Sequence, residues 1–214
     1  MPPGWPVTLA HGAITVRPLR LRDAPDWRNT RVANREWLEP WEATAPGALS
    51  GERGHGYVDA IRALRREAKL GLAMPFALAV DGQFCGQVTV GAITRGSANS
   101  AYLGYWIARG VAGRGIMPTA LALVVDHCFG AAGLHRVEAN IRPENAASRR
   151  VVEKLGFRLE GTRARYIHIA GAWCDHLSYA LTVEDVPGGL LRRWLAQRGD
   201  SRSTGASGSA NSTV

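Results

Sequence analysis

The sequence of 214 residues lacks several features, and each absence narrows what the chain can be. No run of 18 apolar residues occurs, so we expect no helix that spans a membrane. The opening residues, MPPGWP, lack the basic and apolar layout of a signal peptide. Internal repeats and linker-like segments are also missing. With 46% hydrophobic residues, the chain is long enough for one domain with a full core and short for two.

Cysteine is scarce: Cys85, Cys128 and Cys174 are odd in number, widely spaced, and each lies in an apolar stretch. This pattern is typical of reduced thiols in the cytoplasm and argues against disulfides or a zinc site. No histidine accompanies any of them in a recognisable catalytic pattern, so we expect small buried apolar side chains. The six histidines form no metal-binding pattern either, and we predict no metal.

Lysine is almost absent, with only Lys69 and Lys154, although the net charge is +8 and the isoelectric point is about 10.1. The positive charge is therefore nearly all arginine. It suits an anionic partner such as a coenzyme phosphate, a ribosome surface or nucleic acid. It is equally typical of a GC-rich genome, and both interpretations stay open. No basic helix interleaved with aromatic residues is visible, so we expect no direct nucleic-acid readout.

One segment has the pattern of a phosphate-binding strand, turn and helix. An alternating apolar strand, Leu103 to Ala108, is followed by Gly113 and Gly115 and then by a long helical pattern. Glycine lets a backbone turn sharply and approach a ligand closely. The first N–H groups of a helix have no partner inside it and suit a phosphate. Pro118 fits a first helical turn, where its missing N–H is not needed.

Two better known phosphate motifs are excluded at this turn. No Gly-Lys-Ser/Thr follows, as a P-loop requires. The third glycine of the dinucleotide fingerprint is missing, and no acidic residue ends a following strand. Taken alone, the segment also fits a plain strand-to-helix connection whose glycines allow tight packing.

A second segment follows about one strand later. A predicted strand, Val137 to Ile141, leads through a turn into a short helix with Ala147, Val151 and Leu155 on one face. Gly156 closes this helix in the manner of a glycine just past a helix end.

Together, in this order and at this spacing, the two segments resemble the acetyl-CoA motifs of the GNAT acyltransferase superfamily. The resemblance covers about residues 12 to 185. It implies an α/β (α+β) fold: a mixed, mostly antiparallel seven-stranded sheet with helices on both faces. A splayed central strand pair would form the coenzyme site. We expect one N-acetyltransferase domain over residues 1–197 and a disordered Ser/Gly-rich tail over residues 198–214.

Hydrophobic periodicity and turn residues predict the same order of elements. The expected strands cover residues 14–20, 75–80, 84–93, 101–108, 137–141, 157–169 and 173–181. The expected helices cover residues 23–34, 53–70, 115–131, 145–155 and 183–197, with Asp23 as the N-cap of the first.

The resemblance implies acetyl-CoA as the co-substrate. Backbone groups of the splayed strand would pair with pantetheine and the thioester, and the amides of the glycine turn would hold the pyrophosphate. The family prefers Gln or Arg three residues before the first glycine, where this chain has Gly110. The expected coenzyme-binding residues are Trp106, Ile107, Ala108, Arg109, Gly113, Arg114, Gly115, Ile116, Met117, Asn140, Asn145 and Ser148.

The catalytic groups are less clear. Many family members have a Tyr as general acid where this chain has Val152, so we predict that Ser148 hydrogen-bonds the leaving thiolate; local capping is the alternative. Asn145 is expected to cap the helix and contact pantetheine. Asn140 stands where some relatives have a catalytic Glu. Glu138 lies on the same face of that strand and is a candidate base through water, or else a carboxylate paired with an arginine.

The segment Gly-Ala-Trp-Cys-Asp-His at 171–176 and the Trp-rich segment at 34–41 resemble the bacterial Rim-type ribosomal-protein alanine N-acetyltransferases. Core packing is the alternative role for the tryptophans. The acceptor-binding residues that we expect in this case are Glu36, Trp37, Glu39, Trp41, Tyr105 and Asp175. His168 and His176 could edge the acceptor pocket.

Three functions therefore stay open. The first is cytoplasmic acetylation of a protein N-terminus, such as that of a ribosomal protein beginning with Ala or Ser, by a monomer or homodimer. The second is acetylation of a small-molecule amine, such as an antibiotic or an amino acid. The third is a catalytically inactive coenzyme A-binding regulatory module.

Overall fold

The computed structural model describes residues 1–46 and 56–206, and within them eight strands form one mixed sheet. The strand order is β1-β2-β3-β4-β5-β6-β8-β7. The strands are β1 (Leu9–His11), β2 (Ile14–Pro18), β3 (Met74–Val80), β4 (Gln83–Thr94), β5 (Ser100–Ile107), β6 (Arg136–Ile141), β7 (Arg158–Ile169) and β8 (Ala172–Thr182).

The sheet has one strand more than the seven predicted. The additional strand is β1, which pairs antiparallel with β2 through Leu9 opposite Val16 and His11 opposite Ile14. Only three residues long, it is too short to show the alternation of apolar and polar residues by which a strand is recognised.

The pairing of β5 with β6 is the parallel one among the described strands, and it stops early. Ser100 to Tyr102 lie opposite Arg136 to Glu138, whereas β5 runs on to Ile107 and β6 to Ile141. Past Tyr102 and Glu138 the two strands therefore diverge, which confirms the splayed central pair. The opening therefore lies in the middle of the sheet, between the carboxyl ends of β5 and β6.

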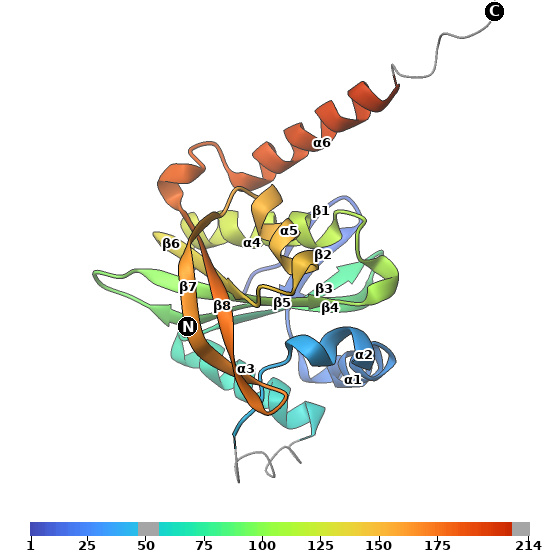
Figure 1. Cartoon of the computed structure of the whole chain (residues 1–214), viewed down its shortest axis with the longest axis vertical. Coiled ribbons are helices and arrows are strands. Elements are labelled where there is room, and N and C mark those ends of the chain that lie inside the picture. Colours follow the sequence, from blue (N-terminus) through green and yellow to red (C-terminus); the bar gives the residue numbers. More distant parts are fainter. Residues whose placement is uncertain (47–55, 207–214) are drawn as a thin grey trace, which may run out of the picture.

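Helices cover both faces of the sheet (Figure 1). The first three lie on one face, and α4 and α5 lie on the other; α6 packs on α4 and then extends away from the body. The helices are α1 (Ala24–Ala33), α2 (Arg35–Leu38), α3 (Tyr57–Leu70), α4 (Ile116–Phe129), α5 (Ala146–Lys154) and α6 (Leu190–Ala206).

Two predicted helix boundaries need comment. The last helix begins at Leu190, not Val183, because Val183–Asp185 forms a short 3₁₀ turn and Pro187-Gly188-Gly189 then interrupts the chain. It continues past the predicted end at Gln197 to Ala206, into the segment expected to be a tail. Residues 207–214 and the predicted start of the 53–70 helix lie outside the described residues.

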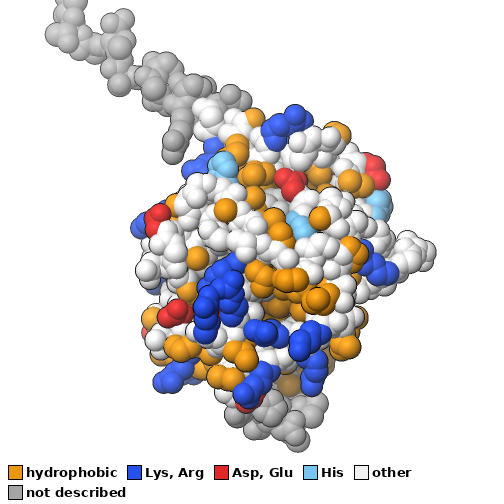
Figure 2. Space-filling view, turned by 180° about the vertical axis from the view of Figure 1, so that it is seen from behind, with side chains coloured by type: hydrophobic (Ala, Val, Ile, Leu, Met, Phe, Trp, Pro, Cys, Tyr) orange, Lys and Arg blue, Asp and Glu red, His pale blue; other side chains and the backbone are white. Residues whose placement is uncertain are grey.

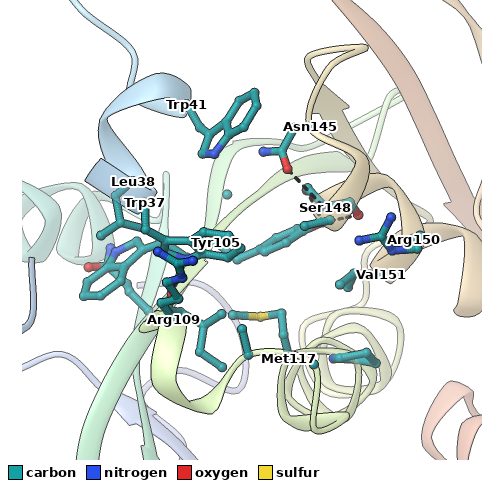
Figure 3. Close-up of a pocket in the computed structure, with 18 of the residues that line it drawn as sticks. Trp37, Leu38, Trp41, Tyr105, Arg109, Met117, Asn145, Ser148, Arg150 and Val151 are labelled. Atoms are coloured by element: carbon teal, nitrogen blue, oxygen red, sulfur yellow. Dashed lines mark hydrogen bonds between the residues drawn. The ribbon is translucent and has the colours of Figure 1, made fainter. Parts of the chain in front are cut away.

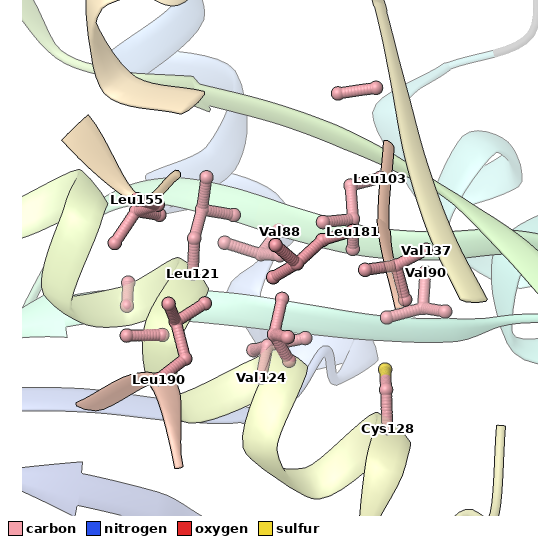
Figure 4. Close-up of a cluster of buried hydrophobic side chains, with 14 of the residues drawn as sticks. Val88, Val90, Leu103, Leu121, Val124, Cys128, Val137, Leu155, Leu181 and Leu190 are labelled. Atoms are coloured by element: carbon pink, nitrogen blue, oxygen red, sulfur yellow. The ribbon is translucent and has the colours of Figure 1, made fainter. Parts of the chain in front are cut away.

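The main core lies between α4 and the sheet (Figure 4). Leu121, Val124 and Cys128 of α4 are fully buried, and strand residues such as Val88 and Val137 complete the cluster. Burial of most of α4 explains why its sequence is apolar on nearly every side. A smaller cluster on the opposite face holds α1 against β4 and α3 against β3.

Asp23 stands at the N-cap position of α1, as predicted, and both Asp23 and Asp126 bind backbone amides. The Asp23 carboxylate accepts from the Arg17 guanidinium at 2.7 and 2.9 Å and from the Arg20 N–H at 2.8 Å, and makes no side-chain cap of α1. Asp126 of α4 accepts from the N–H groups of Leu190 and Leu191, at 2.6 and 3.0 Å. The first turn of α6 is thereby fixed to α4.

Candidate active site

A cavity of about 780 Å³ lies along the part of β5 that is no longer paired with β6. Figure 3 shows Trp37, Leu38 and Trp41 on one side of it, and Asn145, Ser148 and Val151 of α5 on the other. Its wall consists of Trp27, Arg31, Trp37, Leu38, Trp41, Glu42, Ala43, Gln87, Thr89, Gly104, Tyr105, Trp106, Ile107, Arg109, Ala112, Gly113, Gly115, Met117, Pro118, Asn145, Ala147, Ser148, Arg150, Val151, Lys154 and Trp194.

The glycine turn forms one end of this cavity. Gly113 and Gly115 have φ of +77° and +79°, in the left-handed region that favours glycine. Helix α4 begins directly after Gly115, so the partnerless N–H groups of its first turn lie at the cavity wall. Met117 and Pro118 of this turn also line the cavity, whereas Arg114 and Ile116, and Ala108 on the preceding strand end, do not.

The Trp-rich segment docks on the end of β5. Trp37 donates its indole N–H to the carbonyl of Ile107 at 3.0 Å, and the Asn34 side chain accepts from the N–H of Arg109 at 2.8 Å. Trp37 and Trp41 therefore line the cavity. Their neighbours Glu36 and Glu39 do not, and Glu39 forms an exposed ion pair with Arg35 at 3.3 Å.

Ser148 lies at the start of α5, within a small hydrogen-bonded group. Asn145 caps the helix, because its side-chain oxygen accepts from the N–H of Ser148 at 3.0 Å. The Ser148 hydroxyl lies 2.7 Å from the phenol oxygen of Tyr105 (Figure 3). Burial raises the pKa of the Tyr105 phenol, although its bond to Ser148 opposes the shift. At neutral pH the phenol is therefore protonated and able to donate a hydrogen bond.

Glu138 and Asn140 do not line the cavity. Glu138 accepts from the guanidinium groups of Arg136 and Arg163, each at 2.8 Å, so both of its oxygens are occupied. Asn140 accepts from the hydroxyl of Ser178 at 2.7 Å. For Glu138 this geometry favours a carboxylate paired with arginine over a base.

His168 and Asp175 belong to the β7–β8 hairpin and also lie outside the cavity wall. The Nδ1 atom of His168 lies 2.6 Å from the hydroxyl of Thr44. Asp175 accepts from the backbone N–H of Arg165 at 2.7 Å. Both side chains hold local backbone in place in this structure.

Four basic side chains line the cavity, and the sequence pointed to only one of them, Arg109. Arg150 and Lys154 stand four residues apart on α5, a spacing that puts them on one helix face and that could have flagged them. Arg31, from α1, pairs with Glu42 across the cavity wall. On one face of the molecule, Lys and Arg side chains gather round exposed hydrophobic ones (Figure 2).

Two aromatic wall residues, Trp27 and Trp194, were also missed. The indole N–H of Trp27 donates to the side-chain oxygen of Gln87 at 2.6 Å, in a buried contact. The rings of Trp27 and Trp106 meet edge to face at 6.3 Å. Across the described ranges 1–46 and 56–206, no cluster of His, Cys, Asp or Glu could hold a metal ion, and no helix is long and apolar enough to cross a membrane.

An opened sheet with a glycine turn and a helix N-terminus at the opening defines the class of GNAT acetyltransferases. The family model described as acetyltransferase (GNAT) domain matches residues 13–158. The chain belongs to this family of enzymes.

Individual relatives carry more specific names than the family model does. The solved structure of Mycobacterium smegmatis RimJ in complex with CoA-disulfide is 42% identical, with a TM-score of 0.85, and the match covers 92% of this chain and 97% of that one. The [ribosomal protein uS5]-alanine N-acetyltransferase of Escherichia coli (strain K12) is 31% identical over 84% of this chain and 92% of its own length. The ribosomal-protein-S5-alanine acetyltransferase structure from Vibrio fischeri is 30% identical, with a TM-score of 0.73, over 84% of this chain and 98% of that one.

Proposed function

We propose that this protein is a cytoplasmic, acetyl-CoA-dependent N-acetyltransferase that modifies the N-terminal α-amine of a protein. A ribosomal protein beginning with Ala or Ser is the acceptor we favour. One observation carries the proposal: a single cavity along β5 joins the glycine turn before α4 to the tryptophans of residues 34–41. The names of the relatives at 30–42% identity support the choice of acceptor.

The coenzyme would lie along the opening, with its pyrophosphate at the turn of Gly113 and Gly115. Amides of a helix N-terminus favour an anion there. Arg150 and Lys154 add positive charge to the same wall. The extended pantetheine arm would run beside β5 toward Ser148, and the CoA-disulfide complex of the 42% identical relative supports such an occupant.

In this proposal Ser148 stabilises the leaving group. The neutral acceptor amine attacks the thioester carbonyl, the new C–N bond forms, and the C–S bond breaks to leave a thiolate. The proton that the nitrogen loses passes to solvent water, and the thiolate accepts a hydrogen bond from the Ser148 hydroxyl until water protonates it. Tyr105 would donate to the Ser148 oxygen and so leave the serine proton free to point toward sulfur.

The described cavity wall offers no unpaired carboxylate that could act as a base, and this favours one class of acceptor amine. Along this described wall the one carboxylate is Glu42, which is already paired with Arg31. An α-amine, with a pKa of about 7.7–8.0, is roughly a tenth neutral at pH 7, whereas a lysine with a pKa of about 10.4 is almost wholly charged. A site without a free base therefore serves an N-terminus far better than a lysine side chain.

A peptide experiment tests the proposal. Peptides that begin with Ala or Ser and contain one internal lysine are incubated with acetyl-CoA, and the modified position is found by fragmentation mass spectrometry. The matched control peptide has the same sequence with a formylated N-terminus. We expect acetylation at the free N-terminus and none of the blocked peptide. Acetyl groups mainly on lysine would refute the α-amine assignment, and no peptide acetylation would favour a small-molecule acceptor.

A further inference from the structure

The C-terminal helix α6 lies beyond residues 13–158, which the family model matches, yet it reaches the glycine turn. Besides the Asp126 contact described above, the Arg193 guanidinium donates to the carbonyls of Asp185, at 2.9 Å, and Leu155. These bonds hold α6 against the end of α5 as well as against α4. The helix therefore has a fixed position next to the cavity.

Trp194 connects α6 to the glycine turn. Its side chain is 6% exposed and lines the cavity. The indole N–H donates to the hydroxyl of Thr119 at 2.9 Å, and this hydroxyl donates to the carbonyl of Gly115 at 2.8 Å. A chain of two hydrogen bonds thus runs from α6 to the residue that precedes α4.

Arg198 lies four residues after Trp194, on the same face of the helix. Its guanidinium carbon is 5.6 Å from the centre of the Trp194 ring. The same guanidinium lies against Gly115, where a Cβ atom would be only 2.9 Å from its Nη1 atom. Because Gly115 has no side chain, Arg198 can approach the backbone of the turn.

Arg198 has no carboxylate partner among the ion pairs of the described residues. The cavity wall to which its neighbour Trp194 belongs carries two further cations, Arg150 and Lys154. Arg198 also stands at the positive end of the α4 dipole, where a cation is unfavourable and an anion is favoured. A bound anion at the turn would convert this repulsion into attraction.

We propose that Arg198 binds the pyrophosphate of the coenzyme, which makes α6 a wall of the coenzyme site. This inference rests on the proposed function, since it assumes that the coenzyme occupies the cavity. We assign the pyrophosphate rather than the 3′-phosphate because the guanidinium lies at Gly115 itself. A guanidinium and a phosphate form charge-assisted hydrogen bonds that are stronger than neutral ones.

Calorimetric titration of three proteins tests the assignment: the parent chain, Arg198→Gln, and Arg192→Gln as the matched control. Arg192 is an exposed arginine of the same helix whose guanidinium lies against Gly188 and not against Gly115, so its loss changes the net charge equally without touching the glycine turn. Each is titrated with coenzyme A and with dephospho-coenzyme A, which keeps the pyrophosphate but lacks the 3′-phosphate. We expect Arg198→Gln to weaken the binding of both ligands about tenfold. Arg192→Gln should bind both as the parent does.

Three results would overturn the inference: unchanged binding by Arg198→Gln, tighter binding, or a loss confined to coenzyme A, which would assign the 3′-phosphate instead. Melting temperatures without ligand check that the variant is folded. Arg198→Lys keeps the charge and should recover part of the affinity, which a purely structural role would not require. Failure of the parent chain to bind either ligand would refute the proposed function rather than the role of Arg198.

Discussion

Replacement of Tyr105 by Phe tests how the Ser148 hydroxyl is oriented. The phenol oxygen lies 2.7 Å from the Ser148 hydroxyl and 3.2 Å from the Ser148 carbonyl oxygen, and it has one proton to donate. If this proton goes to the hydroxyl oxygen, the serine proton is directed into the cavity. In Tyr105→Phe the serine hydroxyl can rotate and donate elsewhere, although the ring still fills its place.

The size of the effect follows from this one hydrogen bond. A neutral hydrogen bond contributes about 1 kcal/mol net, and one to a charged group about 1.5–3 kcal/mol. The bond strengthens as the thiolate forms, so we expect a loss of about 1–2 kcal/mol in the transition state alone. That corresponds to a fall in kcat of about 5- to 30-fold. The KM for acetyl-CoA should stay within about twofold, because no contact with the coenzyme is removed.

A double-mutant cycle tests whether Tyr105 acts through Ser148. The released thiol is measured for the parent, Tyr105→Phe, Ser148→Ala and the double variant, at saturating acetyl-CoA. Because Tyr105 is proposed to act through Ser148, it should have no further effect once Ser148 is alanine. Additive effects, or a larger loss from Tyr105→Phe than from Ser148→Ala, would contradict the reasoning. Since burial raises the pKa of Tyr105, its ionisation should add no inflection to the pH profile between pH 6 and 9.

Three further predictions concern other parts of the molecule. Gly115→Ala places a side chain at φ +79° and against a guanidinium, so it should cost about 1–2 kcal/mol of stability and weaken coenzyme binding; unchanged melting and titration curves would contradict this. Burial raises the thiol pKa of Cys85 to about 11 and that of Cys128 to about 12, so maleimide at pH 7 should label Cys174 alone until the protein unfolds, as mass spectrometry would reveal. Asp23→Ala should cost about 2 kcal/mol in urea unfolding at pH 7. Burial would raise the pKa of this carboxyl, but its hydrogen bonds and its ion pair with Arg17 lower the pKa below 3.8. The stability that the ionised carboxylate adds is therefore lost as the pH falls below about 4. A difference in stability between the parent and Asp23→Ala that persists at pH 2 would argue against this mechanism.

The parts of the site that sequence could predict depend on near neighbours in the chain. The glycine turn and the cap at Asn145 are set by residues within a few positions, and α5 begins at Ala146 as the pattern indicated. Trp37 and Trp41 reach the cavity because their whole segment docks on β5. The amphipathic and turn patterns likewise predicted seven of the eight described strands.

The contacts that could not be predicted join residues far apart in the chain. Glu138 meets Arg163 across 25 positions, so the sequence around Glu138 contains only its other partner, Arg136, and could not reveal that both carboxylate oxygens are occupied. Trp194 meets Thr119 across 75 positions. Such pairs depend on which strands and helices become neighbours, and periodicity does not report that. For the same reason, α6 was not predicted to contribute to the site.

The gap between β5 and β6 gives the sheet two inner edges, in addition to the outer edges that every open sheet has. An unpaired edge is a poor state for a backbone, because its N–H and C=O groups must find partners elsewhere. An extended ligand with amides of its own could complete the ladder as a missing strand would. Without the ligand these edges would stay unpaired. Binding of the ligand would raise the free energy of unfolding by about 2.7 kcal/mol when the free ligand concentration is a hundred times Kd. The resistance of this protein to heat would therefore depend on the ligand supply of the cell as well as on its sequence.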